Sequence, residues 1–298
     1  MKNRSVREHV ERFMQKDIEN LNLLLYKAFA FYFEPDEIDR GRLDQRNVSE
    51  KFKELLNRVK MQGFQPPSYP DAHCFEMKTA YRLVCGMGYP TLLENGLLLH
   101  HIYGVPYLSG ETLKGLTRGV FLLSLYEALK DKMQDEKNPL NTLEVVLAQE
   151  KESKLLEQVK SLKELRVILS DHTIKEPYES FLKLFGSLQK RGEVIFYDAY
   201  PVGFEPSRHI EFDIMNPHYP EYYRSQGKEP PADWDSPVPV KFLTIAQGVV
   251  FRFCLGFAPL GGVADRRLLG DAEHLLKVGL ENFGVGGKRR KGYGWFVL

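Results

Sequence analysis

Hydrophobic residues in the first part of the chain recur every three or four positions, which is the spacing of one face of an α-helix. This pattern predicts an amphipathic helix within residues 10–33, carried by Leu21, Leu24, Leu25, Ala28 and Phe31. A second helical stretch is predicted for residues 49–61, and prolines at 66, 67 and 70 end the section. We interpret residues 1–72 as a helical extension, with packing or a protein contact as its default role.

Stretches rich in strand-forming residues follow. They predict strands over residues 78–87, 97–103, 193–202, 210–215, 240–257 and 295–298. Helical spacing returns in residues 105–130, with a core stripe of Leu113, Leu116, Val120 and Leu123. A final helix is expected to be capped by Asp271 and to end at Gly284.

Residues 131–192 are charged and helical, and we interpret them as an insertion between sheet elements that serves mainly as a scaffold. Its apolar docking residues are expected to be Phe181, Leu182, Leu184 and Phe185. Residues 73–298 then form one α+β domain around this insertion. A proline-rich loop over residues 220–239 carries Tyr222, Tyr223 and Trp234. Stacking on unpaired bases, anchoring a protein partner and folding over the core are all consistent with these aromatics.

Composition narrows the class of protein. The chain has 298 residues, 43% of them hydrophobic, with 41 Lys and Arg against 40 Asp and Glu. Because the net charge is only +1, any positive surface is local, which favours a subunit that presents one basic face within an assembly. The N-terminus is charged and lacks a signal peptide, and the most apolar run, residues 21–33, is too short to span a bilayer. We expect a soluble, cytoplasmic protein.

The three cysteines, Cys74, Cys85 and Cys254, are odd in number and far apart in sequence. No C-x-x-C pair occurs, so we expect neither a disulfide framework nor a zinc site, and a reducing compartment fits. No other metal or cofactor is predicted.

The C-terminal loop has the most distinctive pattern in the chain. Four consecutive cations, residues 288–291, are surrounded by five glycines in the sequence ENFGVGGKRRKGYGWFVL. Glycine allows backbone N–H groups to turn toward an anion, and adjacent cations favour phosphate. The glycine order matches neither a P-loop nor a dinucleotide-binding fingerprint. A solvated charge run remains an alternative, but glycines on both sides of the charges favour binding of a nucleic-acid backbone.

The helix over residues 105–130 begins at Ser109, a good N-cap whose neighbouring free N–H groups are expected to be open to an anion. Lys114 and Arg118 lie one turn apart on the face opposite the apolar stripe. They fit an extension of the anion site, and they equally fit an exposed, solvated face.

Acids and histidines that could support a nuclease are Asp198, His209, Asp213 and His218. None has metal-ligand spacing, and Asp198 and Asp213 lie within predicted strands. We therefore favour structural or binding roles over catalysis.

Together, the sequences GVGGKRRKGYG, VPYLSGETLKGLTRG and FYDAYPV followed by EFDIMNPHYPEYY resemble the RAMP superfamily of CRISPR-Cas proteins. Within it, the resemblance is greatest to the family of sixth subunits of the type III-B Cmr effector, and it covers about residues 78–298. It implies a ferredoxin-like, RRM-like β-α-β-β-α-β fold. It also implies a non-catalytic RNA-binding subunit at the end of a row of RAMP subunits, near the 3′ part of the guide RNA and the 5′ part of the target. Other RAMP subunits, small helical subunits and both RNAs are then its partners in antiviral silencing of foreign RNA.

The resemblance places the RNA-facing residues in the glycine-rich loop and the first helix. With His218 and Tyr219 of the EFDIMNPHYPEYY segment included, the expected positions are Lys114, Arg118, His218, Tyr219, Gly284, Gly286, Gly287, Lys288, Arg289, Arg290, Lys291, Gly292, Tyr293 and Gly294. Two alternatives stay open. One is a RAMP-type endoribonuclease that processes guide precursors with His209 or His218 as acid or base, and the other is a protein-interaction adaptor without RNA contact.

Overall fold

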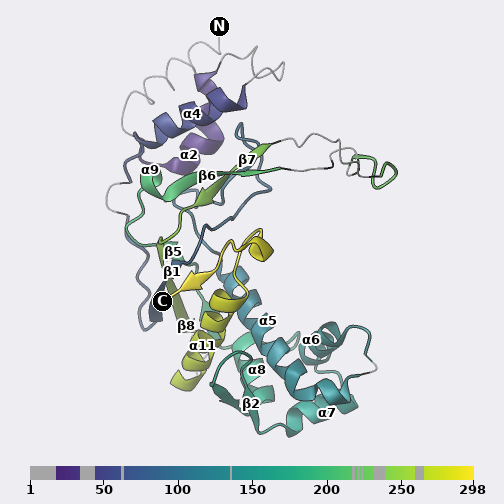
Figure 1. Ribbon diagram of the computed structural model, residues 1–298. Coiled ribbons are helices and arrows are strands. Elements are labelled where there is room, and N and C mark those ends of the chain that lie inside the picture. Colours follow the sequence, from purple (N-terminus) through teal and green to yellow (C-terminus); the bar gives the residue numbers. More distant parts are fainter. Residues whose placement is uncertain are drawn as a thin grey trace. The chain divides into compact units, whose positions relative to one another are not determined.

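The computed structural model describes residues 18–33, 44–61, 64–134, 136–216, 219, 222, 224–230, 239–258 and 265–298. These residues form an α+β protein, as the sequence predicts (Figure 1). The chain divides into two units that interleave in sequence. Unit 1 comprises residues 1–65, 82–107 and 203–249, and unit 2 comprises residues 66–81, 108–202 and 250–298. The predicted division at residue 72 stays a prediction.

Unit 2 is built on an antiparallel sheet with the strand order β4-β8-β1-β9. Its strands are β1 (His73–Thr79), β4 (Val194–Phe196), β8 (Val250–Phe257) and β9 (Phe296–Val297), and β5 (Tyr200–Pro201) also pairs with β8. Two helices, α5 (Gly110–Leu129) and α11 (Arg266–Asn282), pack side by side (Figure 1). Phe251, Phe253 and Phe296 are completely buried, and the ring of Phe296 meets the other two edge to face.

The insertion packs against α5. It contains η3 (Lys130–Lys132), α6 (Pro139–Gln149), α7 (Lys154–Ser161), β2 (Glu164–Arg166), β3 (Thr173–Lys175) and α8 (Pro177–Phe185). The four predicted docking residues of α8 are all buried, and Phe181 meets the ring of Phe121 of α5 at 5.5 Å. The β2–β3 hairpin is not anticipated, because its three-residue strands are charged and resemble the helices around them.

Unit 1 contains short helices around a two-stranded hairpin. Its elements are α2 (Leu21–Leu23), the π-helix η1 (Leu24–Ala28), the 3-10 helix η2 (Phe29–Tyr32), α4 (Gln45–Leu56), α9 (Pro206–His209), β6 (Ile210–Met215) and β7 (Val240–Ile245). Phe52 of α4 packs against Phe29 and Phe212 at ring distances of 5.2 and 6.1 Å. Both predicted helical stretches are helical within the described residues, but the first is irregular and the second runs from Gln45 to Leu56 rather than over residues 49–61.

Several predicted boundaries are wrong. The strand expected at 78–87 is β1, which begins at His73 and ends at Thr79, because Arg82 leaves the sheet to pair with Glu211 and Asp213. The stretch 97–103 is not a strand, since His100 accepts a backbone hydrogen bond from Gly104 and closes a turn. The strand expected at 240–257 is two strands in different units, β7 and β8, separated by a turn at residues 246–249.

Two single-residue expectations are also corrected. The cap of α11 is Asp265, whose carboxylate accepts from the Arg267 N–H at 3.1 Å, while Asp271 is buried within the helix. Cys74 and Cys254 form a disulfide, because they stand opposite each other in the β1–β8 register. Their separation of 180 positions in sequence hides this pairing. Cys85 is free and buried.

Candidate nucleic-acid interface

The glycine-rich loop has a fixed base. Helix α11 ends at Asn282, and the N–H of Gly284 donates to the carbonyl of Gly279 at 2.9 Å, so Gly284 stops the helix as predicted. Across the loop, the N–H of Val285 donates to the carbonyl of Gly294 at 2.9 Å. A Cβ on Gly294 would lie 1.8 Å from that valine's carbonyl oxygen, so only glycine fits. The loop is therefore held closed at its neck.

The cations occupy the tip of this loop. Arg289–Lys291 form a single 3-10 turn, η4, which follows Lys288 in the left-handed conformation with φ 55°. The side chains of Arg289, Arg290 and Lys291 are exposed. In the part of the chain that the structure describes, these three side chains form no ion pair. A tight turn thus presents three adjacent positive charges to solvent.

A groove lies between the loop and α5. Its volume is about 450 Å³, and its sides come from residues 112–123 of α5, the end of α11 and the loop. It is lined by Thr112, Gly115, Leu116, Gly119, Val120, Leu123, Phe283, Gly284, Val285, Gly286 and Arg289. The floor is largely apolar, and Arg289 supplies a cation at its edge. The loop and the first helix therefore meet along this groove.

The other face of α5 carries the two cations singled out in the sequence. Neither Lys114 nor Arg118 lines the groove, because the helical repeat turns them to the opposite side. Arg118 forms an ion pair with Glu144 of α6 at 3.5 Å, and its guanidinium lies 5.1 Å from the ring centre of Phe181. Burial lowers the pKa of Lys114, and the neighbouring Arg118 and Arg191 add to this effect. The structure thus does not bring these two cations to the loop.

The N-terminus of α5 is closed by protein groups. Ser109 is the N-cap, as predicted, and its hydroxyl oxygen accepts from the Thr112 N–H at 3.3 Å. The N–H of Gly110 donates to a carboxylate oxygen of Asp198 at 2.8 Å. The expectation that this helix end is open to an anion is therefore wrong, since a side chain from the FYDAYPV segment already fills the position. Leu108 and Ala199 exchange two backbone hydrogen bonds beside it.

Two further catalytic candidates, Asp213 and His209, also have structural partners. Asp213 pairs with Arg82 at 2.8 Å. The Nδ1 atom of His209 accepts a hydrogen bond from the Glu205 N–H at 3.0 Å, and burial, with Arg208 nearby, lowers the pKa of His209. Asp198 lies in unit 2, whereas His209 and Asp213 lie in unit 1. Within the described residues, no group of three His, Cys, Asp or Glu side chains could hold a metal ion.

The proline-rich loop of residues 220–239 and the segment before it are only partly described. His218, Tyr223 and Trp234 lie outside the described residues. Tyr222 is exposed, and the side chain of Tyr219 is half-buried. The three roles considered for this loop stay predictions.

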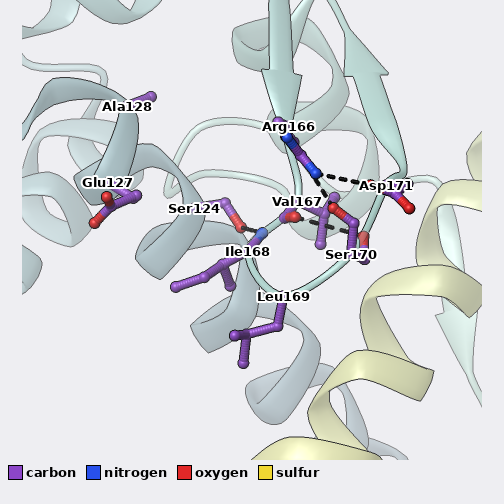
Figure 2. A pocket seen from close by; sticks show the side chains of 9 residues that line it. All are labelled: Ser124, Glu127, Ala128, Arg166, Val167, Ile168, Leu169, Ser170 and Asp171. Atoms are coloured by element: carbon purple, nitrogen blue, oxygen red, sulfur yellow. Dashed lines mark hydrogen bonds and ion pairs between the residues drawn. The ribbon is translucent and has the colours of Figure 1, made fainter.

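A second cavity, of about 640 Å³, lies between the C-terminal half of α5 and the β2–β3 hairpin (Figure 2). Arg166 is paired there with Asp171 at 2.7 Å, and Glu127 adds another negative charge. The Ile168 N–H donates to the hydroxyl of Ser124 at 3.0 Å and ties the hairpin to the helix. With two carboxylates and one already paired cation, this cavity is poorly suited to a polyanion.

Among the described helices, none combines the length and the apolar character needed to cross a membrane.

Comparison with known proteins relates the chain to one family. The sequence model of the RAMP superfamily matches residues 76–297. The "CRISPR system Cmr subunit Cmr6" of Pyrococcus furiosus is 34% identical over 232 residues, which is 74% of this chain and 66% of that protein. The chain thus spans about two thirds of that relative's length.

Two solved structures are also similar. The crystal structure of Cmr6 from Pyrococcus furiosus has 33% sequence identity and a TM-score of 0.44, over 77% of this chain and 99% of that one. A cryo-EM structure of the type III-B Cmr-beta complex bound to cognate target RNA contains a chain with 20% identity and a TM-score of 0.45, over 86% of this chain and 75% of that one. Because the family match takes in most of the sequence, α5 and the glycine-rich loop included, the chain belongs to the RAMP superfamily.

Proposed function

We propose that this chain is a non-catalytic RNA-binding subunit of a type III-B CRISPR-Cas (Cmr) interference complex. Support comes from its 34% identity to a Cmr6 protein and from its membership of the RAMP superfamily. The observation that carries RNA binding is the exposed turn Arg289–Lys291 on a loop with a fixed neck.

The fold of unit 2 is consistent with a ferredoxin-like domain. Apart from the insertion and the short strand β5, its elements follow in the order β1, α5, β4, β8, α11, β9, and each neighbouring pair in the sheet is antiparallel. This order supports a β-α-β-β-α-β arrangement, and the two helices pack together. The glycine-rich loop then joins the second helix to the last strand.

Binding through this loop is electrostatic. Arginine and lysine at the tip contact phosphates, which fix the position of an RNA without reading its sequence. Binding is therefore tolerant of sequence and falls steeply with salt. In the assembly, we place this chain at the end of the row of RAMP subunits, beside the 3′ part of the guide RNA and the 5′ part of the target.

A non-catalytic role is supported by the contacts of the two acids described above. Asp198 closes a helix and Asp213 pairs with an arginine. A general acid or base needs a proton position free to meet substrate. Cleavage of repeat RNA by the isolated chain, lost in His218→Ala, would instead support the endoribonuclease alternative.

The first test replaces Lys288, Arg289, Arg290 and Lys291 with alanine in the reconstituted complex. We expect loss of nuclease protection near the 3′ end of the guide RNA, because the variant no longer neutralises the phosphates there. In a salt titration with single-stranded RNA, the slope of log affinity against log salt should become shallower by up to about 3, at roughly 0.7 for each phosphate that the variant leaves without a cation.

The matched control replaces four exposed lysines of the insertion, Lys132, Lys137, Lys151 and Lys154, which changes the net charge equally. This control variant should protect the 3′ end of the guide RNA as the wild type does, and its slope of log affinity against log salt should be unchanged. Circular dichroism checks that both variants are folded. If the loop variant protects the guide as well as the wild type does, the loop serves folding or a protein contact, and the adaptor alternative takes first place.

A further inference from the structure

The groove beside the glycine-rich loop is more apolar than a phosphate clamp requires. Leu116 and Leu123 on α5 are only partly buried, and Phe283 at the end of α11 is likewise half-exposed. Leu116 and Leu123 belong to the predicted core stripe of their helix, yet both also line the groove, while Leu116 lies against Gly279 of α11. Part of the apolar face of α5 is therefore left for something other than this helix's own core.

Two glycines keep the α5 side of the groove flat. Gly115 and Gly119 stand four positions apart within the helix, and a Cβ at either would meet no atom within 4 Å. Glycine within a helix is less stable than alanine, so packing inside the described structure does not explain the choice. An occupant from outside the chain that approaches the helix backbone does explain it.

The edge of the groove identifies the kind of occupant. Arg289 lines the groove, and Arg290 and Lys291 follow in the same turn. An occupant that fits must therefore carry a flat apolar face and negative charge close together. A volume of about 450 Å³ falls within the range of roughly 300–1,000 Å³ that is typical of small-ligand clefts.

We infer that the groove takes the base of one unpaired nucleotide of the bound RNA, while the flanking phosphates contact the loop cations. This inference rests on the proposed RNA-binding function and adds a base site to its phosphate contacts. Phe283 offers an aromatic surface for the base, and none of the ring contacts among the described residues involves it. A protein segment would match the apolar floor, but it would need acidic residues beside its apolar side chain to match the edge.

The test fills or removes the base site without changing charge. Gly119→Leu places a side chain in the groove, and Phe283→Ala removes the aromatic ring. Gly270→Leu is the matched control, because Gly270 is an exposed glycine within helix α11 whose Cβ position is also open. The full-length chain is titrated with a fluorescein-labelled single-stranded RNA and with an oligonucleotide of equal length in which the bases are removed.

Both groove variants should bind the normal RNA about tenfold more weakly, the size expected for loss of one stacked base. Their salt slope should equal that of the wild type, because the phosphate contacts remain. The wild type should lose affinity for the abasic oligonucleotide, whereas the groove variants should bind both oligonucleotides equally. The Gly270→Leu control should behave as the wild type.

The outcomes separate this inference from the proposed function. If the loop-cation variant loses RNA binding but the groove variants bind as the wild type does, the base site is wrong and the phosphate clamp stands. If the wild type does not bind single-stranded RNA at low salt, both are overturned. Normal RNA affinity together with failed complex assembly in Gly119→Leu would overturn the base site and assign the groove to a protein partner.

Discussion

Among single residues, Asp198 links two segments that are far apart in the sequence. Its carboxylate accepts from the first N–H of α5, and the adjacent Ala199 pairs with Leu108. Gly110 fits there because a Cβ would lie 2.0 Å from the carbonyl oxygen of Phe196. The acid therefore has a capping role, which accounts for it without catalysis.

Replacing Asp198 tests this role. Asp198→Ala should lower the free energy of unfolding by about 1–2 kcal/mol, as loss of a helix cap does, and Asp198→Asn should cost less because its amide oxygen still accepts. Urea denaturation measures both. Asp171→Ala, which removes a fully exposed carboxylate, should leave the denaturation midpoint unchanged. Equal stability of Asp198→Ala and the wild type would refute the capping role.

The three cysteines allow a second test at the level of single residues. Burial raises the pKa of Cys85 to about 12, so its thiol stays protonated and unreactive in the folded protein. With Cys74 and Cys254 joined, a thiol reagent at pH 8 should titrate no cysteine in the native chain. It should titrate one after unfolding and three after unfolding with reductant. Two or more reactive thiols before reduction would contradict the disulfide.

At the scale of elements, α5 contacts both the insertion and the groove beside the glycine-rich loop. One face, with Arg118, packs on the insertion, and another, with Gly115 and Gly119, lines the groove. Sequence periodicity predicts the helix and its Ser109 cap because both depend on local spacing. The partner of each face is not predictable in this way, since it depends on where residues 139–185 and 283–289 lie.

The same distinction explains the other successes and errors. Gly284 is correctly predicted as a helix stop, because a glycine after an apolar stripe is a local signal. The turn at residues 246–249 is missed because apolar residues precede and follow it closely. Only Gln247 and Gly248, the latter at φ 79°, interrupt the apolar run. The groove is missed as well. Its only local sign is the pair Gly115 and Gly119, which lowers helix stability without a visible reason.

Helix α11 should make the stability of unit 2 depend on pH. Asp271 is buried, and its carboxylate lies within hydrogen-bond distance, 2.7 Å, of the Nε2 atom of His172. The ring of His172 stacks on that of His274, with the ring centres 4.3 Å apart. Burial lowers the pKa of His274, with His172 and Lys277 adding to the effect. Glu273 lies nearby: burial raises its pKa, but hydrogen bonds from Lys277 and His73 outweigh this and leave the pKa lowered.

The sign for His274 follows from its lowered pKa. Above the pKa of about 6.5 in the unfolded chain, His274 is neutral in both the folded and the unfolded state, so its titration does not change the free energy of unfolding. As pH falls below that value, the unfolded chain takes up a proton before the folded chain does, so stability decreases. We expect the melting temperature to fall between pH 7 and pH 5, and to fall less in His274→Gln. Equal pH profiles for the two proteins would show that His274 does not contribute.

At the scale of the whole molecule, the two units alternate along the chain. Along the sequence, residues 82–107 and 203–249 of unit 1 are each preceded and followed by a segment of unit 2. Neither unit is therefore a continuous piece of sequence, and no single truncation isolates one of them. Point substitutions in the full-length chain are thus the way to test either unit without removing parts of the other.

The disulfide between Cys74 and Cys254 adds a covalent consequence to this arrangement. The bond closes a ring that contains α5, the insertion and both of those unit 1 segments, whereas the glycine-rich loop lies on the tail that leaves the ring. A protease that cuts once anywhere inside the ring produces two fragments that still migrate as one molecule on a non-reducing gel. A cut between Cys254 and the loop, by contrast, releases the cationic tip at once.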